Sequence, residues 1–179
     1  MNKAIIPNLI TGMRILGAVL LLFVSAFRLP FYIIFTLCGI TDALDGYLAR
    51  KLGVTSELGS KLDGFADVVF YSIMVLKLFP VMLEKMPIVV WIMLAVAIGI
   101  RGSIYVVSAL KFSRFASSHT YLNKASGMLA FLAPYFAPTA FFAIYCGIWC
   151  VLGIVSAIED LLLHINSKQY PDKKSILIK

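Results

Sequence analysis

The chain has 179 residues, of which 61% are hydrophobic and only 14% are charged, and its mean hydropathy is +0.94. This composition is typical of an integral membrane protein. It excludes collagen-like and disordered chains, which need far more Gly, Pro and charge, and disulfide scaffolds, which need more than 3 Cys. The net charge of +7 does not indicate a nucleic-acid partner, because the basic residues fall at the ends of apolar segments, where they orient a membrane protein and attract anionic lipid.

The first apolar segment, residues 7–27, is long enough at about 1.5 Å per residue to cross a hydrocarbon core of about 30 Å. A secretory signal peptide is the competing interpretation, because Lys3 precedes the segment and V-S-A at 24–26 weakly resembles a cleavage site. However, Asn8, Thr11 and Arg14 recur every three residues and form a polar helix face. A signal peptide does not need such a face, so we interpret the segment as a membrane span.

Polar residues and prolines divide the remaining apolar sequence into further spans. The predicted spans are residues 31–51, 59–79, 88–110, 125–136 and 139–163. The fifth of the six spans is short for a full crossing, so we expect its first turns to begin within the polar connection 111–124. Ala137-Pro138 predicts a tight hairpin before the last span. The expected fold is an all-α membrane bundle of six transmembrane helices.

Basic residues are concentrated on one side of this six-span topology. Only Arg28 and Lys85 fall on the other side. The side rich in basic residues contains Lys3, Arg50, Lys51, Lys61, Lys111, Arg114, Lys124, Lys168, Lys173, Lys174 and Lys179. We expect a multi-pass protein of a bacterial cell membrane. By the positive-inside rule, we expect both termini, and the acidic stretch described next, on the cytoplasmic side.

Four carboxylates, Asp42, Asp45, Asp63 and Asp67, lie within 26 positions of a chain that is otherwise mostly apolar. Charged side chains at bilayer depth are costly, so such a group is a functional site by default. Spacings of three and four place each pair on one helix face, and two helices joined by a short loop are antiparallel neighbours, so we expect the four carboxylates to converge. Like charges at that range repel, and all-oxygen ligation suits hard divalent ions such as Mg²⁺ or Mn²⁺. Four carboxylates suit a pair of ions, a recurring solution for displacement at phosphorus.

Small residues accompany the carboxylates. Small residues at Gly46, Ala49 and Gly59 leave little side-chain bulk on the two helix surfaces, which would let a bulky ligand approach the backbone. Arg50 is placed to offer a bidentate fork to a phosphate. The stretch therefore has the parts of a pyrophosphate-binding metal centre.

The full pattern from 42 to 67, D-x2-D-G-x2-A-R-x8-G-x3-D-x3-D, resembles the signature of the CDP-alcohol phosphotransferase (phosphatidyltransferase) family, and every fixed position matches. The resemblance implies a six-helix membrane enzyme, usually a homodimer, which transfers a phosphatidyl group from CDP-diacylglycerol to a small polar alcohol and releases CMP. It also implies that the four carboxylates hold two divalent cations, Mg²⁺ or Mn²⁺, with Asp67 acting in addition as general base. The implied CDP site comprises Asp42, Gly46, Ala49, Arg50 and Gly59. We expect residues 1–165 to be the six-span catalytic membrane domain and residues 166–179 a basic cytoplasmic tail.

The acceptor alcohol has to be inferred from other residues. The start of the chain, P-N-L-I-T-G-M-R-I, resembles the first helix of phosphatidylglycerophosphate synthases, so we place Asn8 and Thr11 in the donor site and expect glycerol 3-phosphate as acceptor. A phosphorylated acceptor needs cations near the metals. The candidates are Arg14, Arg101, Lys111, Arg114 and Lys124. However, many glycerophosphate-type enzymes carry D-P-x-A-D-K where this chain has D-G-F-A-D-V at 63–68. Serine, inositol phosphate or a further phosphatidyl acceptor therefore stay open.

Two other classes fit parts of the pattern. A divalent-cation transporter or channel would use the carboxylates as an ion path. Such a path has no need for Arg50 beside the carboxylates or for glycines on the helix surfaces. A catalytically silent scaffold of the same fold is expected to lack a carboxylate, whereas this chain has all four.

Overall fold

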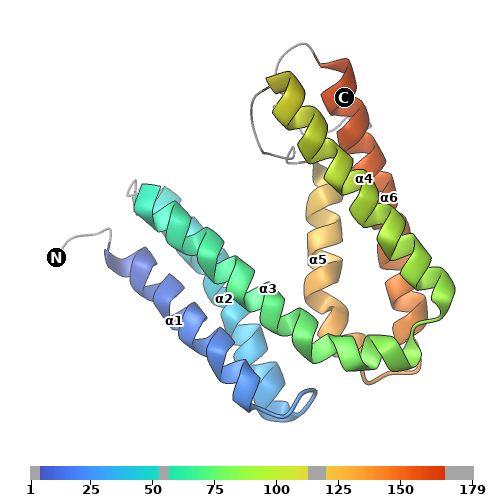
Figure 1. Ribbon diagram of the computed structural model, residues 1–179. Helices are drawn as coiled ribbons and strands as arrows, with labels where there is room; N and C mark the ends of the chain where they lie inside the picture. Colours follow the sequence, from blue (N-terminus) through green and yellow to red (C-terminus); the bar gives the residue numbers. More distant parts are fainter. Residues whose placement is uncertain (1–4, 53–56, 113–119, 168–179) are drawn as a thin grey trace. The chain divides into compact units, whose positions relative to one another are not determined.

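The computed structural model describes residues 5–52, 57–112 and 120–167, and these residues form α-helices joined by turns, with no strand (Figure 1). The helices are α1 (Ile5–Phe23), α2 (Leu29–Leu52), α3 (Glu57–Lys85), α4 (Ile88–Phe112), α5 (Tyr121–Phe136) and α6 (Phe142–Asn166). Their number and order within the described residues confirm the expected all-α chain of six helices.

Two prolines affect the helix ends differently from what the sequence suggests. α2 begins at Leu29, so Pro30 lies in its first turn, where a missing backbone N–H costs nothing and the fixed φ suits the helix. α3 continues past Pro80 to Lys85, beyond the expected end at 79. A proline inside a membrane helix removes one backbone hydrogen bond, but neighbouring groups commonly satisfy the freed carbonyl. Pro80 therefore does not end the helix.

The fifth helix begins earlier than its apolar run. Thr120 is the N-cap, and its Oγ1 accepts a hydrogen bond from the backbone N–H of Asn123 at 3.2 Å. This side-chain cap satisfies one of the donors left free at a helix start, so the helix can begin at Tyr121. The expectation that its first turns lie within the 111–124 connection is confirmed. A tight turn follows Phe136, whose carbonyl accepts from Thr139 N–H at 2.9 Å.

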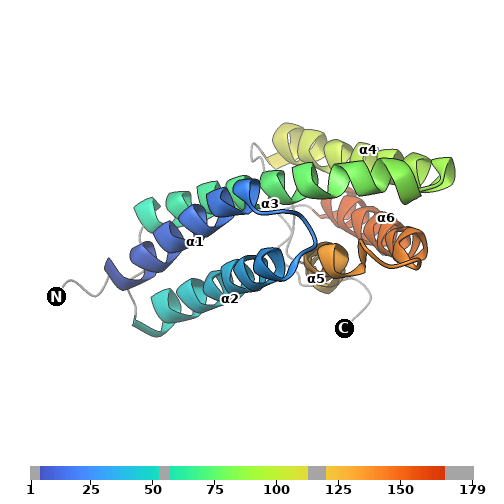
Figure 2. The same ribbon diagram turned by 90° about the horizontal axis from the view of Figure 1, so that it is seen from below.

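The described helices fall into two compact units, and the first, Met1–Leu83, contains α1, α2 and most of α3. α1 and α2 pack side by side (Figures 1 and 2). Aromatic rings join α2 to α3: the ring of Phe35 stacks on that of Phe70 with centroids 5.2 Å apart, and on that of Phe31 at 5.8 Å. All three rings are buried. This aromatic core places the start of α3 beside the end of α2.

A lysine of α3 closes the end of α1. Lys77 Nζ donates hydrogen bonds to the carbonyl oxygens of Leu22 and Val24 at 3.0 and 2.9 Å. The last carbonyls of a helix have no partner within the helix, so a cation here satisfies them and opposes the negative end of the helix dipole. The contact ties α1 to α3 away from the acidic end of α3.

The second unit, Glu84–Lys179, contains α4, α5 and α6, and α6 packs against both of the others. The buried residues of α6 include Cys146, Cys150, Gly153 and Ala157, which recur at helical spacings of three and four. Two side chains of α6 bind backbone carbonyls of α5. Tyr145 Oη donates to Leu129 O at 2.6 Å, and Trp149 Nε1 donates to Ser126 O at 3.1 Å. The α5–α6 pair is thereby fixed in register.

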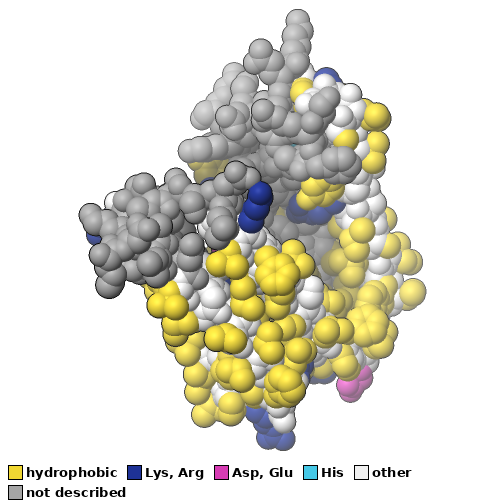
Figure 3. Space-filling model, turned by 60° about the vertical axis from the view of Figure 1, so that its left-hand side comes forward, with side chains coloured by type: hydrophobic (Ala, Val, Ile, Leu, Met, Phe, Trp, Pro, Cys, Tyr) yellow, Lys and Arg dark blue, Asp and Glu magenta, His cyan; other side chains and the backbone are white. Residues whose placement is uncertain are grey.

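The outer faces of the helices are apolar, as a lipid environment requires. In the described part of the chain, the helices Lys61–Lys85, Ile88–Phe112 and Phe142–Asn166 are long and apolar enough to cross a membrane, and Leu9–Phe23 and Leu29–Asp42 are shorter apolar helices. Figure 3 shows hydrophobic side chains over much of the described surface on the face that it draws. Exposed examples are Leu16, Leu76, Leu110 and Ile144. Exposed apolar surface on this scale promotes aggregation in water, whereas lipid acyl chains solvate it. The fold is that of an integral membrane helical protein, as expected.

Gly17 marks a close approach between α1 and α2. A Cβ added there would lie 2.8 Å from Cys38 Sγ, closer than real Cβ contacts allow. Cys38 is itself buried and cannot turn away without losing its packing. Glycine at 17 is therefore required by the spacing of the two helices.

We predict that Gly17→Ala lowers the melting temperature of the detergent-solubilised protein, because the added methyl group overpacks the α1–α2 contact at a cost of about 1–3 kcal/mol. That cost exceeds the gain of about 1 kcal/mol from the better helix propensity of alanine.

The matched control is Gly12→Ala in the same helix, where an added Cβ meets nothing within 4 Å and only the propensity gain remains. Adding Cys38→Ala to Gly17→Ala removes the clashing sulfur and is expected to restore part of the loss. Equal melting temperatures for the two glycine variants would refute the close contact.

Candidate functional site

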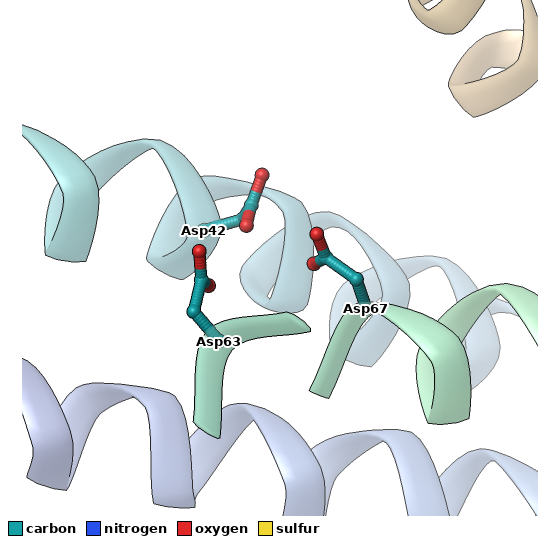
Figure 4. A group of neighbouring side chains, drawn as sticks. All are labelled: Asp42, Asp63 and Asp67. Carbon is teal, nitrogen blue, oxygen red and sulfur yellow. The ribbon is translucent and has the colours of Figure 1, made fainter. Parts of the chain in front are cut away.

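Carboxylates from α2 and α3 meet in the first unit. Asp42 lies on α2, and Asp63 and Asp67 lie one turn apart near the start of α3. Each offers one oxygen, and the three oxygens lie within 4.8 Å of one another. Figure 4 shows the three carboxyl groups around a common space between the two helices. The structure therefore brings together three of the four predicted carboxylates; Asp45 is on α2, but its side chain lies outside the described residues.

The three carboxylates are accessible from outside the protein. Their side chains are 49%, 46% and 44% exposed for Asp42, Asp63 and Asp67. The backbone beneath them is packed, since Ala66 between the two α3 carboxylates is fully buried. A fixed helix face thus carries acidic groups that an ion or a polar ligand can reach.

Arg14 of α1 provides the positive charge at this cluster. Its Nη1 pairs with Asp42 Oδ1 and lies 3.0 Å from Asp67 Oδ1, and its Nη2 pairs with Asp63 Oδ1. The Arg14 residue is 2% exposed, so the guanidinium is held under the carboxylates and away from solvent. A buried guanidinium is strongly destabilising unless it is paired, and the three carboxylates supply that pairing. The polar face expected on the first span is therefore directed at the acidic cluster.

The position of Arg14 follows from the buried stripe of α1. The buried residues of this helix are Thr11, Arg14, Ala18 and Leu21, at spacings of three and four. These spacings place all four side chains on one face. Arg14 lies on the same face as these small and apolar residues, so packing of α1 buries its backbone position. Its long side chain then reaches the carboxylates.

The donor set fits a hard divalent cation. The clustered ligands are carboxylate oxygens alone, which suits Mg²⁺ or Mn²⁺ better than softer ions. Their spread of up to 4.8 Å is on the scale set by two metal–oxygen bonds of about 2.0–2.6 Å each. Arg14 contacts the same oxygens, so a bound cation would share its ligands with the guanidinium.

The donor-site residues expected from the sequence lie in the same helices. Thr11 is buried on α1, and Gly59 is partly exposed in the first turn of α3. The side chains of Asn8 on α1 and of Ala49 and Arg50 on α2 lie outside the described residues, as does the surface at Gly46. Their backbone positions put them on the helices that carry the cluster.

Three of the basic acceptor candidates lie in the second unit. Arg101 on α4 donates from Nη2 to Asn123 Oδ1 at 3.1 Å. Lys124 on α5 is exposed, with Nζ 6.0 Å from the centre of the Tyr121 ring. Lys111 at the end of α4 donates to the carbonyls of His164 and Ile165 at 3.1 and 2.5 Å, so it closes the end of α6. Arg114 lies outside the described residues. Arg14, the remaining candidate, is in the first unit.

Sequence reasoning did not single out a buried polar group behind Arg101. Asp160, Ser156 and His164 of α6 are fully buried, and Asn123 Nδ2 donates to Asp160 Oδ2 at 3.3 Å. The signal was present, since Glu159 and Asp160 are acidic residues in an otherwise apolar span and such residues are rarely without a role. The partner of Asp160 on α5, Asn123, was not apparent from the sequence.

Comparison with known proteins identifies the family. The family model described as CDP-alcohol phosphatidyltransferase matches residues 4–164. Among curated relatives, a CDP-diacylglycerol–glycerol-3-phosphate 3-phosphatidyltransferase of Pseudomonas fluorescens is 36% identical over 113 residues, 59% of this chain and 54% of the relative. The enzyme with the same name from Pectobacterium atrosepticum is 39% identical over 75 residues, 38% of this chain and 40% of the relative. No solved structure matches the chain.

A third relative has a different acceptor in its name. A CDP-diacylglycerol–serine O-phosphatidyltransferase of Methanocaldococcus jannaschii is 35% identical over 68 residues, 38% of this chain and 31% of the relative. The matched stretches thus span about a third to about half the length of these relatives. The family match runs through all six described helices and includes the acidic cluster. The chain belongs to the CDP-alcohol phosphatidyltransferase family.

Proposed function

We propose that this protein transfers a phosphatidyl group from CDP-diacylglycerol to an alcohol and releases CMP. The observation that carries the proposal is that carboxylate oxygens of Asp42, Asp63 and Asp67 lie within 4.8 Å of one another, in a chain of the CDP-alcohol phosphatidyltransferase family. A divalent-cation path would also use carboxylates. It would have no need for Arg50 beside the carboxylates or for the glycines on the helix surfaces, which the pattern from 42 to 67 includes.

In the proposed mechanism, the carboxylates of Asp42, Asp45, Asp63 and Asp67 would hold two Mg²⁺ or Mn²⁺ ions. When bound, such ions would supply positive charge that stabilises the pyrophosphate of the donor during displacement at phosphorus. Asp67 takes the proton from the acceptor hydroxyl. The hydroxyl oxygen then forms a bond to the phosphorus that carries the diacylglycerol, and the bond from that phosphorus to CMP breaks.

The remaining motif residues bind the donor in this proposal. Gly46, Ala49 and Gly59 leave room for the cytidine nucleotide against the helices, and Arg50 binds a phosphate oxygen. Asn8 and Thr11 complete the donor site from α1. The cluster lies in the second half of α2 and the first half of α3, with carboxylates 44–49% exposed, which supports an arrangement in which nucleotide and acceptor arrive from water while acyl chains stay in lipid.

Glycerol 3-phosphate is the proposed acceptor, with serine as the alternative. Two of the three relatives described above carry glycerol 3-phosphate in their names, and one carries serine. A phosphorylated acceptor also accounts for the basic residues Arg101 and Lys124, and for Arg114 and Lys111 as further contacts. An inositol phosphate or another alcohol would use the same donor chemistry.

The proposal extends to the setting of the enzyme. Residues 1–165 would form the catalytic domain and residues 166–179 a basic cytoplasmic tail. Both termini and the active site would face the cytoplasm of a bacterial cell, in agreement with the distribution of Lys and Arg. We propose a homodimer, as the family resemblance implies.

We predict that the purified protein, supplied with CDP-diacylglycerol and Mg²⁺ or Mn²⁺, releases CMP with one member of an acceptor panel. The panel contains glycerol 3-phosphate, serine, inositol phosphate and phosphatidylglycerol, and CMP is measured directly. Glycerol 3-phosphate is expected to give the highest rate. Absence of CMP with every acceptor would overturn the proposed function, and metal flux into liposomes without nucleotide lipid would favour the transporter.

Asp67→Asn is expected to lower kcat by about 10²–10⁴-fold, because an amide cannot accept the proton of the acceptor hydroxyl. Binding of CDP-diacylglycerol, measured by isothermal titration calorimetry in detergent, is expected to change little. The comparison variant is Asp63→Asn, which removes a proposed ligand and is expected to weaken metal and donor binding. If Asp67→Asn loses donor binding to the same extent, Asp67 is an essential ligand and not the base.

Arg14→Gln is expected to lower the melting temperature in EDTA, because the three carboxylates then repel one another with no guanidinium between them. The expected cost is about 1–3 kcal/mol, below the value for a fully buried pair because the carboxylates are half exposed.

Adding Mg²⁺ is expected to restore much of the stability of Arg14→Gln and to stabilise the wild type less, since its carboxylates already have a counter-charge. Thr11→Val, on the same buried stripe, is the control for loss of a buried polar group. A melting temperature for Arg14→Gln in EDTA equal to that of the wild type would show that the ion pairs do not stabilise the protein.

A further inference from the structure

A chain of hydrogen bonds links Arg101 to a buried carboxylate through a neutral amide. Arg101 Nη2 on α4 donates to Asn123 Oδ1 on α5 at 3.1 Å, and Asn123 Nδ2 donates to Asp160 Oδ2 on α6 at 3.3 Å. Each of the three helices of the second unit contributes one residue. Asp160 is fully buried, and Arg101 is partly exposed, so the chain runs from the interior toward the surface.

The carboxylate determines which way the amide faces. Asn123 Oδ1 accepts from Arg101 and also from Ser156 Oγ at 2.5 Å, while Nδ2 faces Asp160. A flipped amide would place its N–H groups against the guanidinium and its oxygen against the carboxylate. Both contacts would be repulsive, because a guanidinium only donates and an ionised carboxylate only accepts. Asp160 therefore holds the acceptor oxygen of Asn123 toward Arg101.

The amide is also fixed from the backbone side. The N–H of Asn123 binds Oγ1 of the fully buried Thr120, the N-cap of α5. On the far side, Asp160 Oδ1 lies 3.1 Å from His164 Nδ1, one turn along α6. Both ends of the chain of hydrogen bonds are thus tied to helices, and the guanidinium is held at a defined position beside the first turn of α5, which carries Lys124.

The neutral link leaves the charge of Arg101 available. In the described part of the chain, the guanidinium binds an amide oxygen and no carboxylate. A direct ion pair would neutralise the arginine, as happens to Arg14 in the first unit. An amide orients a guanidinium without cancelling its charge, and an oriented guanidinium is suited to the paired oxygens of a phosphate.

We propose that Asn123 and Asp160 are positioning residues, which hold Arg101 as a receptor for the phosphate of a phosphorylated acceptor alcohol. The inference rests on the proposed function and limits the acceptor to phosphorylated alcohols, because a zwitterionic acceptor such as serine has no phosphate for this arginine to bind. Arg101 contacts the acceptor; Asn123 and Asp160 act through it.

The test is steady-state kinetics of the full chain in detergent, with CDP-diacylglycerol and glycerol 3-phosphate varied separately. Asp160→Asn removes the charge that orients the amide, and Asn123→Ala removes the amide. Each is expected to raise the KM for glycerol 3-phosphate about tenfold to a hundredfold, the range seen when a residue supporting a binding group is lost. The KM for CDP-diacylglycerol and the kcat at saturating acceptor are expected to stay within about twofold.

Ser108→Ala is the matched control, because Ser108 is fully buried on the same helix as Arg101 and its Oγ has no hydrogen-bond partner among the described residues. It is expected to leave both KM values unchanged. Asn123 is only partly buried, so Asn123→Ala keeps the proposal testable if Asp160→Asn does not fold.

Three outcomes would overturn the inference. In the first, both variants lower the melting temperature and kcat while the KM for glycerol 3-phosphate is unchanged, which assigns the network a structural role only. In the second, both KM values rise equally. In the third, the wild type releases CMP with serine and with no phosphorylated acceptor, which removes the phosphate receptor but leaves the phosphatidyl transfer. Absence of CMP from the wild type with every acceptor is the separate result that overturns the proposed function itself.

Discussion

A charge carried into an apolar helix bundle needs a counter-charge within the protein, and the first unit is arranged around that need. The guanidinium of Arg14 is buried on the packing stripe of α1, and Asp42, Asp63 and Asp67 reach it from α2 and α3. Coulomb attraction at such distances is strong where water is scarce, and it adds to the apolar contacts and to the hydrogen bonds of Lys77 that also hold these helices. The aromatic stack of α2 on α3 sets the spacing at which these pairs form.

The second unit holds its arginine by different chemistry. Its arginine and its buried acid are separated by Asn123, so the hydrogen bonds orient Arg101 while its charge remains unneutralised. Direct pairing in the first unit keeps acidic groups close together, which suits a cation site. Within the described residues, indirect pairing in the second unit leaves Arg101 without a carboxylate in direct contact, which suits an anion. The two arginines therefore differ in their surroundings and not in their own chemistry.

Much of this organisation could be predicted from the sequence, because hydrophobic runs and the breaks between them are local properties. Six helices, the start of the fifth and the meeting of Asp42 with Asp63 and Asp67 all follow from spacing along the chain. What the polar face of α1 contacts could not be predicted, because the partners of Arg14 are set by tertiary packing. The helical path through Pro80 depends likewise on neighbours that satisfy the freed carbonyl. The link from Arg101 to Asp160 needs the relative rotation of three helices, which no single segment encodes.

The ion pairs of Arg14 also affect how α1 is inserted into the membrane while the chain is being synthesised. The helix that carries the arginine leaves the ribosome before its partners, which follow 28, 49 and 53 residues later. An arginine at the centre of an isolated membrane helix costs about 2.5–3.5 kcal/mol in insertion experiments. By this measure α1 alone is a costly span, and the cost falls as Asp42 of α2 and then Asp63 and Asp67 of α3 become available for pairing. Insertion of the first unit therefore depends on three helices together, and the residues of the acidic cluster help to complete it.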